Sequence, residues 1–390
     1  MKLAWFRADT PPLAGPLDDT GALIAQLRSV HEIEVFTAAS AHDFVWEHFR
    51  APYDLSVYEL DNTPAHAFIW PYLLHYGGVL QLRTLILHDS RAAALLRVQR
   101  SRDYVAEFVF NHGPWPGRSP AVPPAYPGDW PMLRVPLLAS RVAVVSHPPA
   151  AAALQQAHPG ACVRFARTGV TANREVQADE GVLPVLQDVR GTSVTFGTIP
   201  GDRLDVVRRA MARACQAGAS AELIVDATPG GLLQTADVIV SLPWPSFGEP
   251  QTPALTAMAA GKPVIVLETV ATADWPALDA QTWRPRGPTA DAPIAVSIDP
   301  RDEEHSLMLA IRRLSTDATL RAKLGNAAHD WWRTHATPGH AAEDWGRILT
   351  EAALLNPPAR PADWPGHLTA DGTERAREIL DSCGVAVDFL

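Results

Sequence analysis

Short apolar runs alternate with longer amphipathic segments along this 390-residue chain, and this alternation restricts its possible folds most strongly. Such alternation is typical of βαβ units, in which helices join parallel strands. Nearly continuous apolar runs such as TLIL and VAVV indicate sheets covered on both faces. The sequence therefore predicts two α/β domains in tandem. The predicted strands are Leu3–Arg7, Glu32–Thr37, Leu55–Leu60, Thr84–His88 and Val142–Ser146, then Val194–Gly197, Glu222–Val225, Val238–Leu242, Pro263–Leu267 and Ile294–Ile298.

Changes in periodicity divide the chain into two domains, a linker and a tail. The linker has weak hydrophobic periodicity. The tail contains a Pro-rich run before a last helix, and we expect it to pack back on the first domain. The parts are a first domain at 1–172, a linker at 173–192, a second domain at 193–355 and a tail at 356–390.

The first domain contains one long segment, Asn111–Pro136, that is rich in proline, glycine and tryptophan. It is not expected to form a helix or a central strand, because proline lacks the N–H donor that either would need. A long loop inside a compact domain is typically a lid, a binding loop or disordered. Trp115 and Trp130 favour a binding loop, with their rings as contacts for an acceptor molecule.

The net charge is −10, from 33 basic and 43 acidic residues. General nucleic-acid binders carry the opposite sign, so no nucleic-acid partner is expected. No stretch approaches about 18 consecutive apolar residues, and the N-terminus lacks a signal-peptide core. These features predict a cytoplasmic protein without an integral membrane segment. Arginines in residues 91–102 leave two alternatives, a peripheral contact with the inner membrane face or a solvated helix face.

In open parallel sheets, ligands bind beyond the carboxyl ends of the strands, where loops lead into helix N-termini. The residues that follow each predicted strand are therefore candidates for a site. Gly15 lies in the turn before a helix that begins near Asp18, and a glycine there lets backbone N–H groups approach an anion closely. The alternative is an ordinary loop in which the aspartate caps the helix.

Polar side chains follow the third and fourth predicted strands of the first domain. Asn62 and His66 come after the strand that ends at Leu60, and they either cap the next helix or reach a ligand in the cleft. His88 and Asp89 end the apolar run LILHDS. A histidine there can hydrogen-bond a sugar hydroxyl or transfer a proton, with Asp89 orienting it. The alternative is a helix cap beside a hydrogen-bonded histidine.

The richest candidate follows the third predicted strand of the second domain. Its Pro/Gly loop carries Glu249 and leads into a short helix, with Thr252 as the expected N-cap and Pro253 after it. The backbone amides of Gln251, Thr252 and Ala254 would face an incoming phosphate, aided by the helix dipole. Glu249 is suited to accept hydrogen bonds from nearby hydroxyls. A phosphate beside a polyol would fit a nucleotide-sugar, whereas an ordinary capped loop is the alternative.

The segment ADVIVSL…GE…PALTAMAAGKPVIV resembles the donor-binding signature of GT-B glycosyltransferases, specifically the retaining group 1 family, or family four. In that family a first Glu is followed eight residues later by a second Glu, directly before AMAxGxPVI. Here the second position is Thr256, and 256 − 249 = 7. The resemblance implies that Glu249 contacts the donor sugar. It places Thr256 at the ribose hydroxyls, where a hydroxyl replaces the bidentate carboxylate.

The likeness extends over most of the chain. PPLAG…LIAQL resembles the family's PPxxSG loop, and LHD resembles the segment of its catalytic-cleft histidine, carried over to His88. FGTIPGDRLDVVRRAM resembles the start of its second domain, where Arg203 would neutralise the diphosphate. The implied fold is GT-B, with two Rossmann-like, doubly wound parallel-sheet domains facing a cleft. The candidates are His88 and Glu249 for catalysis, Gly15, Arg203, Gln251, Thr252, Ala254 and Thr256 for the donor, and Asn62, His66 and Asp89 for the acceptor side.

The resemblance implies transfer of a hexose from a nucleoside diphosphate sugar to a carbohydrate, lipid-linked or small-molecule acceptor, with retention of configuration. No DxD triplet occurs, which agrees with a mechanism that needs no metal or cofactor. The three cysteines form no CxxC pair and are expected to be buried thiols. Two other functions stay open. One is a GT-B sugar-nucleotide epimerase or hydrolase, and the other is a degenerate module that binds a sugar or a protein partner.

Overall fold

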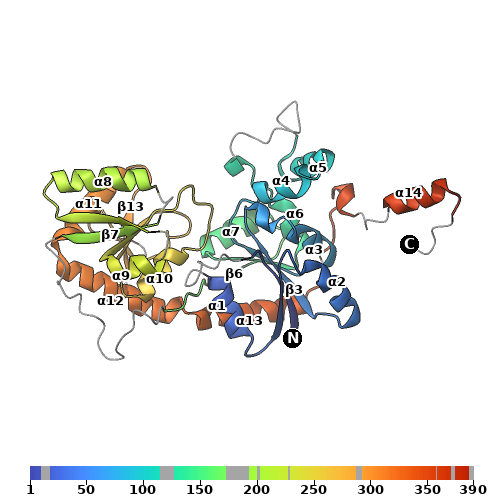
Figure 1. Ribbon diagram of the computed structural model, residues 1–390, viewed down its shortest axis with the longest axis horizontal. Helices are drawn as coiled ribbons and strands as arrows, with labels where there is room; N and C mark the ends of the chain where they lie inside the picture. The colour runs from blue at the N-terminus through green and yellow to red at the C-terminus, as the bar shows by residue number, and fades with distance from the viewer. Residues whose placement is uncertain are drawn as a thin grey trace.

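Two largely parallel sheets, each with helices on both faces, form the centres of two lobes in the computed structural model (Figure 1). The predicted fold class of two doubly wound α/β domains is confirmed. Gly15, Trp115 and the linker 173–192 lie outside the described residues. The structure describes residues 1–9, 18–114, 127–172, 193–199, 203–226, 229–286, 292–356, 358–369 and 374–385.

The first domain is built on a six-stranded parallel sheet. In chain order its elements are β1 (Lys2–Phe6), α1 (Asp19–Leu27), β2 (Glu32–Phe36), α2 (Ala41–Arg50), β3 (Leu55–Leu60), η2 (Pro64–His66), α3 (Ile69–Tyr76), β4 (Val79–Leu82), α4 (His88–Leu96), α5 (Ser101–His112), η3 (Pro127–Asp129), α6 (Arg134–Ala139), β5 (Val142–Val145), α7 (Pro148–Ala157) and β6 (Val163–Phe165). The strand order is β2-β1-β3-β4-β5-β6, so the sheet reverses its direction of growth between β1 and β3.

The second domain is built on a seven-stranded sheet, with the order β12-β11-β13-β10-β9-β7-β8. Its elements are β7 (Val194–Thr198), α8 (Leu204–Gln216), β8 (Ala221–Val225), α9 (Pro229–Thr235), β9 (Val238–Ser241), α10 (Thr252–Ala259), β10 (Val264–Leu267), β11 (Ala277–Asp279), β12 (Pro285–Arg286), β13 (Ala295–Ile298), α11 (Glu303–Thr316) and α12 (Ala318–His335). Helices α8 and α11 cover one face, and α9, α10 and α12 cover the other. The direction of growth reverses between β7 and β9.

Strand β4 lies earlier in the chain than the sequence predicts. It spans Val79–Leu82, whereas the predicted strand Thr84–His88 forms a loop and the first residue of α4. The polar Gln81 interrupts the apolar run of β4 and hides it in the sequence. Ile86 and Leu87 are apolar because their loop is buried in the core, not because it is extended.

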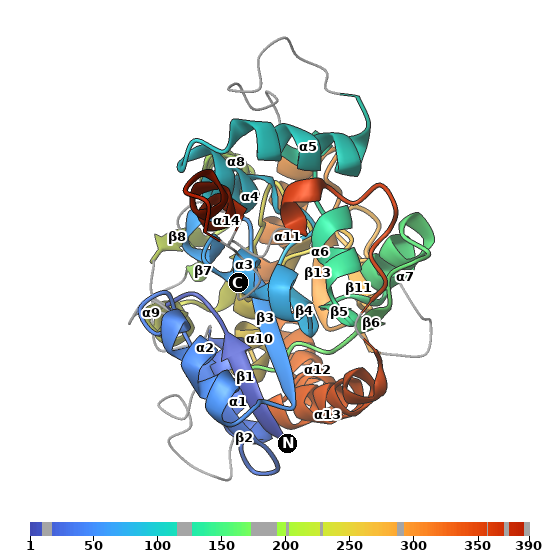
Figure 2. The ribbon, with the colours of Figure 1, turned by 90° about the vertical axis from the view of Figure 1, so that its right-hand side faces the viewer.

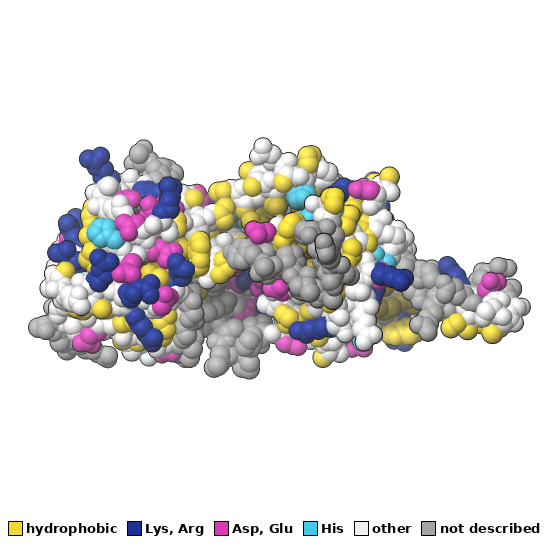
Figure 3. All heavy atoms as spheres, turned by 90° about the horizontal axis from the view of Figure 1, so that it is seen from above, with side chains coloured by type: hydrophobic (Ala, Val, Ile, Leu, Met, Phe, Trp, Pro, Cys, Tyr) yellow, Lys and Arg dark blue, Asp and Glu magenta, His cyan; other side chains and the backbone are white. Residues whose placement is uncertain are grey.

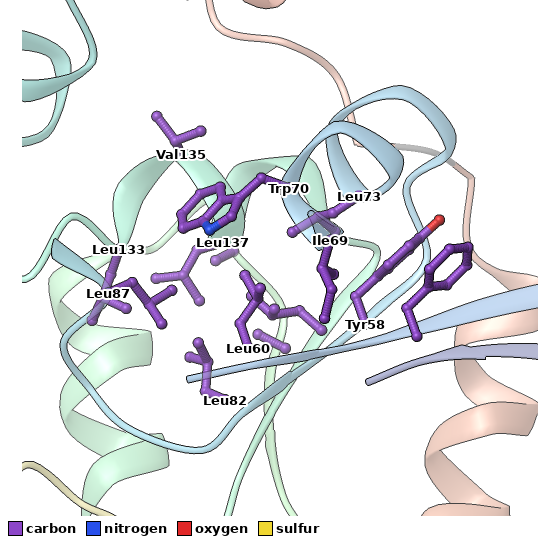
Figure 4. Packing of buried hydrophobic residues seen from close by; sticks show 14 of the residues in the cluster. Tyr58, Leu60, Ile69, Trp70, Leu73, Leu82, Leu87, Leu133, Val135 and Leu137 are labelled. Atoms are coloured by element: carbon purple, nitrogen blue, oxygen red, sulfur yellow. The ribbon is translucent and has the colours of Figure 1, made fainter. Parts of the chain in front are cut away.

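The core of the first domain holds this loop in place. Figure 4 shows Trp70 of α3 beside Leu87 of the loop and Leu133 before α6, above Leu60 of β3. The indole N–H of Trp70 donates to Ser90 Oγ of α4 at 2.9 Å, so the buried ring leaves no polar atom unsatisfied. Because these side chains are fully buried, the 83–87 loop has a fixed position at the carboxyl edge of the sheet.

Helix α13 (Pro338–Leu354) belongs by its packing to the first domain, although the sequence analysis placed it in the second. It lies beside α1 on one face of the first sheet (Figure 2), where the ring centroid of Trp345 is 5.1 Å from that of Trp5. Arg167 Nε pairs with Asp344 of α13 at 2.7 Å. The chain therefore returns to the first sheet after completing the second domain.

Residues 358–369 of the tail also contact the first domain. The ring centroid of Trp364 is 5.4 Å from that of Phe110, and Leu368 lies in the first-domain core. His367 Nε2, in η4 (Gly366–Leu368), donates to the buried Glu107 carboxylate at 2.7 Å. Helix α14 (Glu374–Ser382) stands apart from both lobes in Figure 1.

Charges of both signs alternate on the outer face of the second domain, over α8 and α11 (Figure 3). Glu304 accepts from Arg209 at 2.8 Å and from Arg213 at 2.9 Å. This pairing interrupts the positive charge on this face.

A close helix contact in the second domain requires glycine at position 325. A Cβ atom on Gly325 of α12 would lie 2.2 Å from the carbonyl oxygen of Gly261, the turn after α10. We therefore expect Gly325→Ala to lower the free energy of unfolding by about 1–3 kcal/mol. Gly346→Ala in α13 is the matched control, since nothing lies within 4 Å of its Cβ position. Gly346→Ala should raise the free energy of unfolding by about 0.5–1 kcal/mol. Equal changes for the two variants in urea unfolding would contradict the close contact between Gly325 and Gly261.

Candidate functional site

Each sheet offers a crevice where its direction of growth reverses, between β1 and β3 in the first domain and between β7 and β9 in the second. At such a reversal, the loops after two neighbouring strands lead to opposite faces of the sheet. They leave room for a ligand beyond the carboxyl ends of the strands. The side chains that line the two crevices differ in character.

The second crevice opens into a largely apolar pocket. Thr256 and Ser241 are hydroxyl-bearing residues in its lining, and Thr256 Oγ1 donates to the carbonyl of Thr252 at 2.8 Å. Such a pocket suits the face of a ring better than a charged group. Apolar walls come from Ile199, Leu232, Leu233, Ile239 and Pro253.

Helix α10 begins beside this pocket. Its N-cap is Gln251, one residue before the predicted Thr252, which is instead the first helical residue. The Gln251 side chain makes no cap and donates to the carbonyl of Glu249 at 3.1 Å. The amides of Thr252 and Ala254 are therefore left at the positive end of the helix dipole.

Glu249 lies between the domains, in the loop before α10. Its carboxylate accepts from the backbone N–H of Phe247 at 2.8 Å and from Ser246 Oγ at 3.4 Å. It also accepts from Thr84 Oγ1 of the first domain at 3.4 Å. Both domains thus contact this carboxylate, and its acceptor atoms face hydroxyl and amide donors.

Arg203 is the N-cap of α8, with a left-handed backbone (φ 45°). Its guanidinium donates to the carboxylate of Glu303, at 2.9 Å through Nε and also through Nη2. The guanidinium carbon lies 5.3 Å from the ring centroid of Trp244, in the loop that carries Glu249. Arg203 therefore stands near the predicted donor side, but a diphosphate has to compete with Glu303 for it.

His88 does not end a strand, contrary to the sequence analysis. It is the first residue of α4 and only 1% exposed, and Arg83 is the residue that follows β4. Its Nε2 is hydrogen-bonded to the Tyr104 hydroxyl at 2.6 Å and its Nδ1 to Asp89 at 3.2 Å. Burial, helped by Asp89, raises the pKa of Tyr104 to about 12, so this hydroxyl stays protonated. The structure places His88 behind the surface as a hydrogen-bonded buried histidine.

The acceptor-side candidates are partly brought together. Asn62 Oδ1 accepts from the backbone N–H of Asp89 at 2.7 Å, and Asn62 Nδ2 donates to Asp89 Oδ2 at 3.1 Å. Asn62 thus caps α4, and the Asp89 side chain is 50% exposed in front of His88. His66 is buried and pairs with Thr63 Oγ1 at 2.9 Å, and burial lowers its pKa.

A network of charges, missed in the sequence, fills the first crevice. Arg7 follows β1 and pairs with Asp18 at 2.8 Å, while Arg83 follows β4 and pairs with Asp19 at 2.7 Å. Glu59 of β3 lies 3.6 Å from each guanidinium. Burial raises the pKa of Glu59, although both arginines oppose this shift. The signal in the sequence was a charged residue directly after two strands.

The structure places two further residues that the sequence singled out for surface contacts, Trp130 and Arg91. Trp130 packs on α5, with its ring centroid 5.0 Å from Phe108 and 5.3 Å from His112. Arg91, the first arginine of residues 91–102, is buried and paired with Glu107 at 2.6 Å. Trp130 is thus half-buried and Arg91 is withdrawn from the surface, whereas Arg97, Arg100 and Arg102 of the same stretch are exposed.

The thiols are more exposed than predicted: Cys162 is half-buried, and Cys215 and Cys383 are exposed. Cys215 lies near the end of α8 and Cys383 directly follows α14, and neither side chain packs into a hydrophobic core. No group of three metal-ligating side chains occurs in the ranges that the structure describes. No described helix combines the length and the apolar composition that crossing a membrane requires.

The two facing α/β domains define a GT-B fold. The chain is similar to sucrose-phosphate synthase from Thermosynechococcus elongatus, with 13% identity, a TM-score of 0.56 and coverage of 90% of this chain and 98% of the other. It is also similar to Anabaena HepE in complex with UDP and glucose, with 13% identity, a TM-score of 0.51 and coverage of 90% and 100%. No protein-family model and no curated protein match the chain.

Proposed function

We propose that the chain is a glycosyltransferase that moves a hexose from a nucleoside diphosphate sugar to an acceptor, with retention and without a metal or cofactor. One loop carries this proposal. Between β9 and α10 it joins an apolar pocket, a helix start without a side-chain cap, and the carboxylate of Glu249. HepE, which shares the fold, has been crystallised with UDP-glucose and supports a nucleotide-sugar as the donor.

Each part of the donor has a place in this site. The nucleobase enters the apolar pocket, with Thr256 beside the ribose. The diphosphate lies at the amides of Thr252 and Ala254 and draws Arg203 toward it, so that departing negative charge is stabilised without a metal ion. The sugar hydroxyls donate to Glu249. An acceptor, whether carbohydrate, lipid-linked or small molecule, approaches past Asn62, Asp89 and, behind them, His88.

A second candidate is a GT-B module that binds a sugar-nucleotide but does not transfer the sugar. The pairing of Arg203 with Glu303 and the burial of His88 favour it, because both features withdraw groups from the cleft. Calorimetric titration with UDP, GDP and ADP tests both candidates, since binding of none contradicts both. UDP release from UDP-glucose that requires an added acceptor supports transfer. UDP release without any acceptor indicates a hydrolase, whereas conversion of UDP-glucose into another UDP-sugar without UDP release indicates an epimerase.

Arg203→Ala should weaken UDP binding about tenfold or more, since a charge-assisted hydrogen bond contributes about 1.5–3 kcal/mol. Calorimetry measures the change. Arg209→Ala is the matched control, because Arg209 lies on the same helix and pairs with Glu304 on the outer face. Equal affinities of the two variants would exclude Arg203 from the diphosphate site.

A further inference from the structure

The loop that carries Glu249 is held by donors from the other domain. The backbone N–H of Leu85 donates to the carbonyl of Phe247 at 2.6 Å. Thr84 Oγ1 donates to the Glu249 carboxylate at 3.4 Å, and His147 Nε2 donates to the Glu249 carbonyl at 3.1 Å. All three donors belong to the first domain and all three acceptors to the second, so these bonds exist only while the domains are closed.

Among the described residues, the His147 ring hydrogen-bonds only to this carbonyl. His147 follows β5 as the N-cap of α7, but its side chain makes no cap for that helix. A carbonyl oxygen only accepts, so Nε2 carries the proton in this bond. The ring is buried, and burial lowers the pKa of His147 although the bond to Glu249 and the charge of Asp274 oppose this shift. The imidazole therefore donates as a neutral group near pH 7.

Gly248 shows how closely the two domains approach here. Its φ is +83°, a conformation that side chains rarely adopt, and a Cβ atom would lie 2.9 Å from Leu85 Cγ. Any larger residue would push the loop away from Leu85. The backbone of Gly248 in the second domain therefore packs directly against the Leu85 side chain of the first domain, and this contact does not depend on the His147 bond.

We infer that His147 is a positioning residue which, with Thr84 and Leu85, clasps the Glu249 loop when the domains close. This role rests on the proposed function, in which Glu249 contacts the donor sugar. Because the imidazole holds the main chain of Glu249, it fixes the point from which the carboxylate projects. Opening the domains releases the carbonyl and lets the loop move away from the first domain. The clasp therefore links domain closure to the geometry of the transfer step.

Kinetics with UDP-glucose test the positioning role. His147→Leu should lower kcat about tenfold to a hundredfold, because small misplacements of reacting groups have effects of that size. KM for UDP-glucose should stay within about twofold, since His147 contacts no part of the proposed nucleotide site. His147→Gln should recover most of kcat, because its amide N–H can donate to the same carbonyl. His158→Leu, at the far end of α7, is the matched control and should behave as wild type.

Small-angle X-ray scattering tests the clasp without any substrate. Unliganded His147→Leu and Thr84→Val should both show a larger radius of gyration than wild type and His158→Leu. This readout decides the inference even if the protein turns over no UDP-glucose, and Thr84→Val, which removes another donor of the clasp, decides it if His147→Leu does not fold. Wild-type scattering of Thr84→Val and of any folded His147→Leu would overturn the clasp. If His147→Gln turned over as slowly as His147→Leu, the positioning role would be wrong.

Discussion

Glu249→Gln should reduce sugar transfer at least about a hundredfold, the size of effect seen when one electrostatic contact to a transition state is removed. The amide keeps the shape of the side chain and can still accept from the backbone N–H of Phe247. The loop should therefore stay in place, with a melting temperature within about 2 °C of wild type. Activity and thermal unfolding measured on the same preparation check both parts of this result.

Glu222→Gln is the matched control for this variant. Glu222 is also a glutamate of the second domain, but it is exposed near the amino-terminal end of β8, at the opposite edge of the sheet from the β9–α10 loop, where it accepts from Ser193 Oγ at 2.7 Å. Its replacement should leave transfer unchanged. Full activity of Glu249→Gln would remove Glu249 from the reaction, and a large fall in melting temperature would make its role structural.

Glu107→Gln should be the most destabilising of these substitutions. Glu107 is fully buried, accepts from Arg91 Nε at 2.6 Å and also accepts from His367 Nε2 at 2.7 Å. Removing its charge leaves the Arg91 guanidinium buried without a counter-charge, which costs about 3–5 kcal/mol. It also weakens the contact that fastens residues 358–369 to α5. Urea unfolding of the first domain, followed through tryptophan fluorescence, measures the loss.

Glu304→Gln is the control for the buried network, because Glu304 also serves two cations but lies on the exposed face of α8 and α11. Exposed pairs contribute about 0–1 kcal/mol, so its effect should be small. Equal losses in the two variants would contradict the account of Glu107 as a buried counter-charge.

The same network predicts a pH dependence. Burial alone would raise the pKa of Glu107, but Arg91 and His367 outweigh it and hold the pKa below the ordinary 4.5. Ionised Glu107 therefore stabilises the folded state fully above pH 4.5, and this stabilisation is lost as the pH falls through the lower folded-state value. The gap in stability between wild type and Glu107→Gln should accordingly narrow in acid.

The strands around the candidate donor site were predictable because their apolar runs are short, buried and bounded by turns, as in Val238–Ser241 and Val264–Leu267. Strand β4 was misplaced because the buried, polar Gln81 interrupts its apolar run. A sequence pattern shows hydrophobicity and not burial, so the error arises where a buried residue is polar.

Within the site, local chemistry was predictable and long-range pairing was not. The loop before α10 was predicted as a candidate site from its glycine, its prolines and Glu249. Nothing in the sequence indicates that Arg203 forms an ion pair with Glu303, or that the His88 ring forms a hydrogen bond with the Tyr104 hydroxyl. These pairs join residues far apart in the chain, and only the folded sheets decide which side chains meet.

A crystal structure of the protein with UDP-glucose is the sharpest test of the proposed donor site. We expect the uracil in the pocket between Ile199 and Leu232, and the diphosphate at the amides of Thr252 and Ala254. The glucose should lie beside the Glu249 carboxylate. A nucleotide bound elsewhere, or a second crevice without one in crystals soaked at saturating UDP-glucose, would contradict the proposed site.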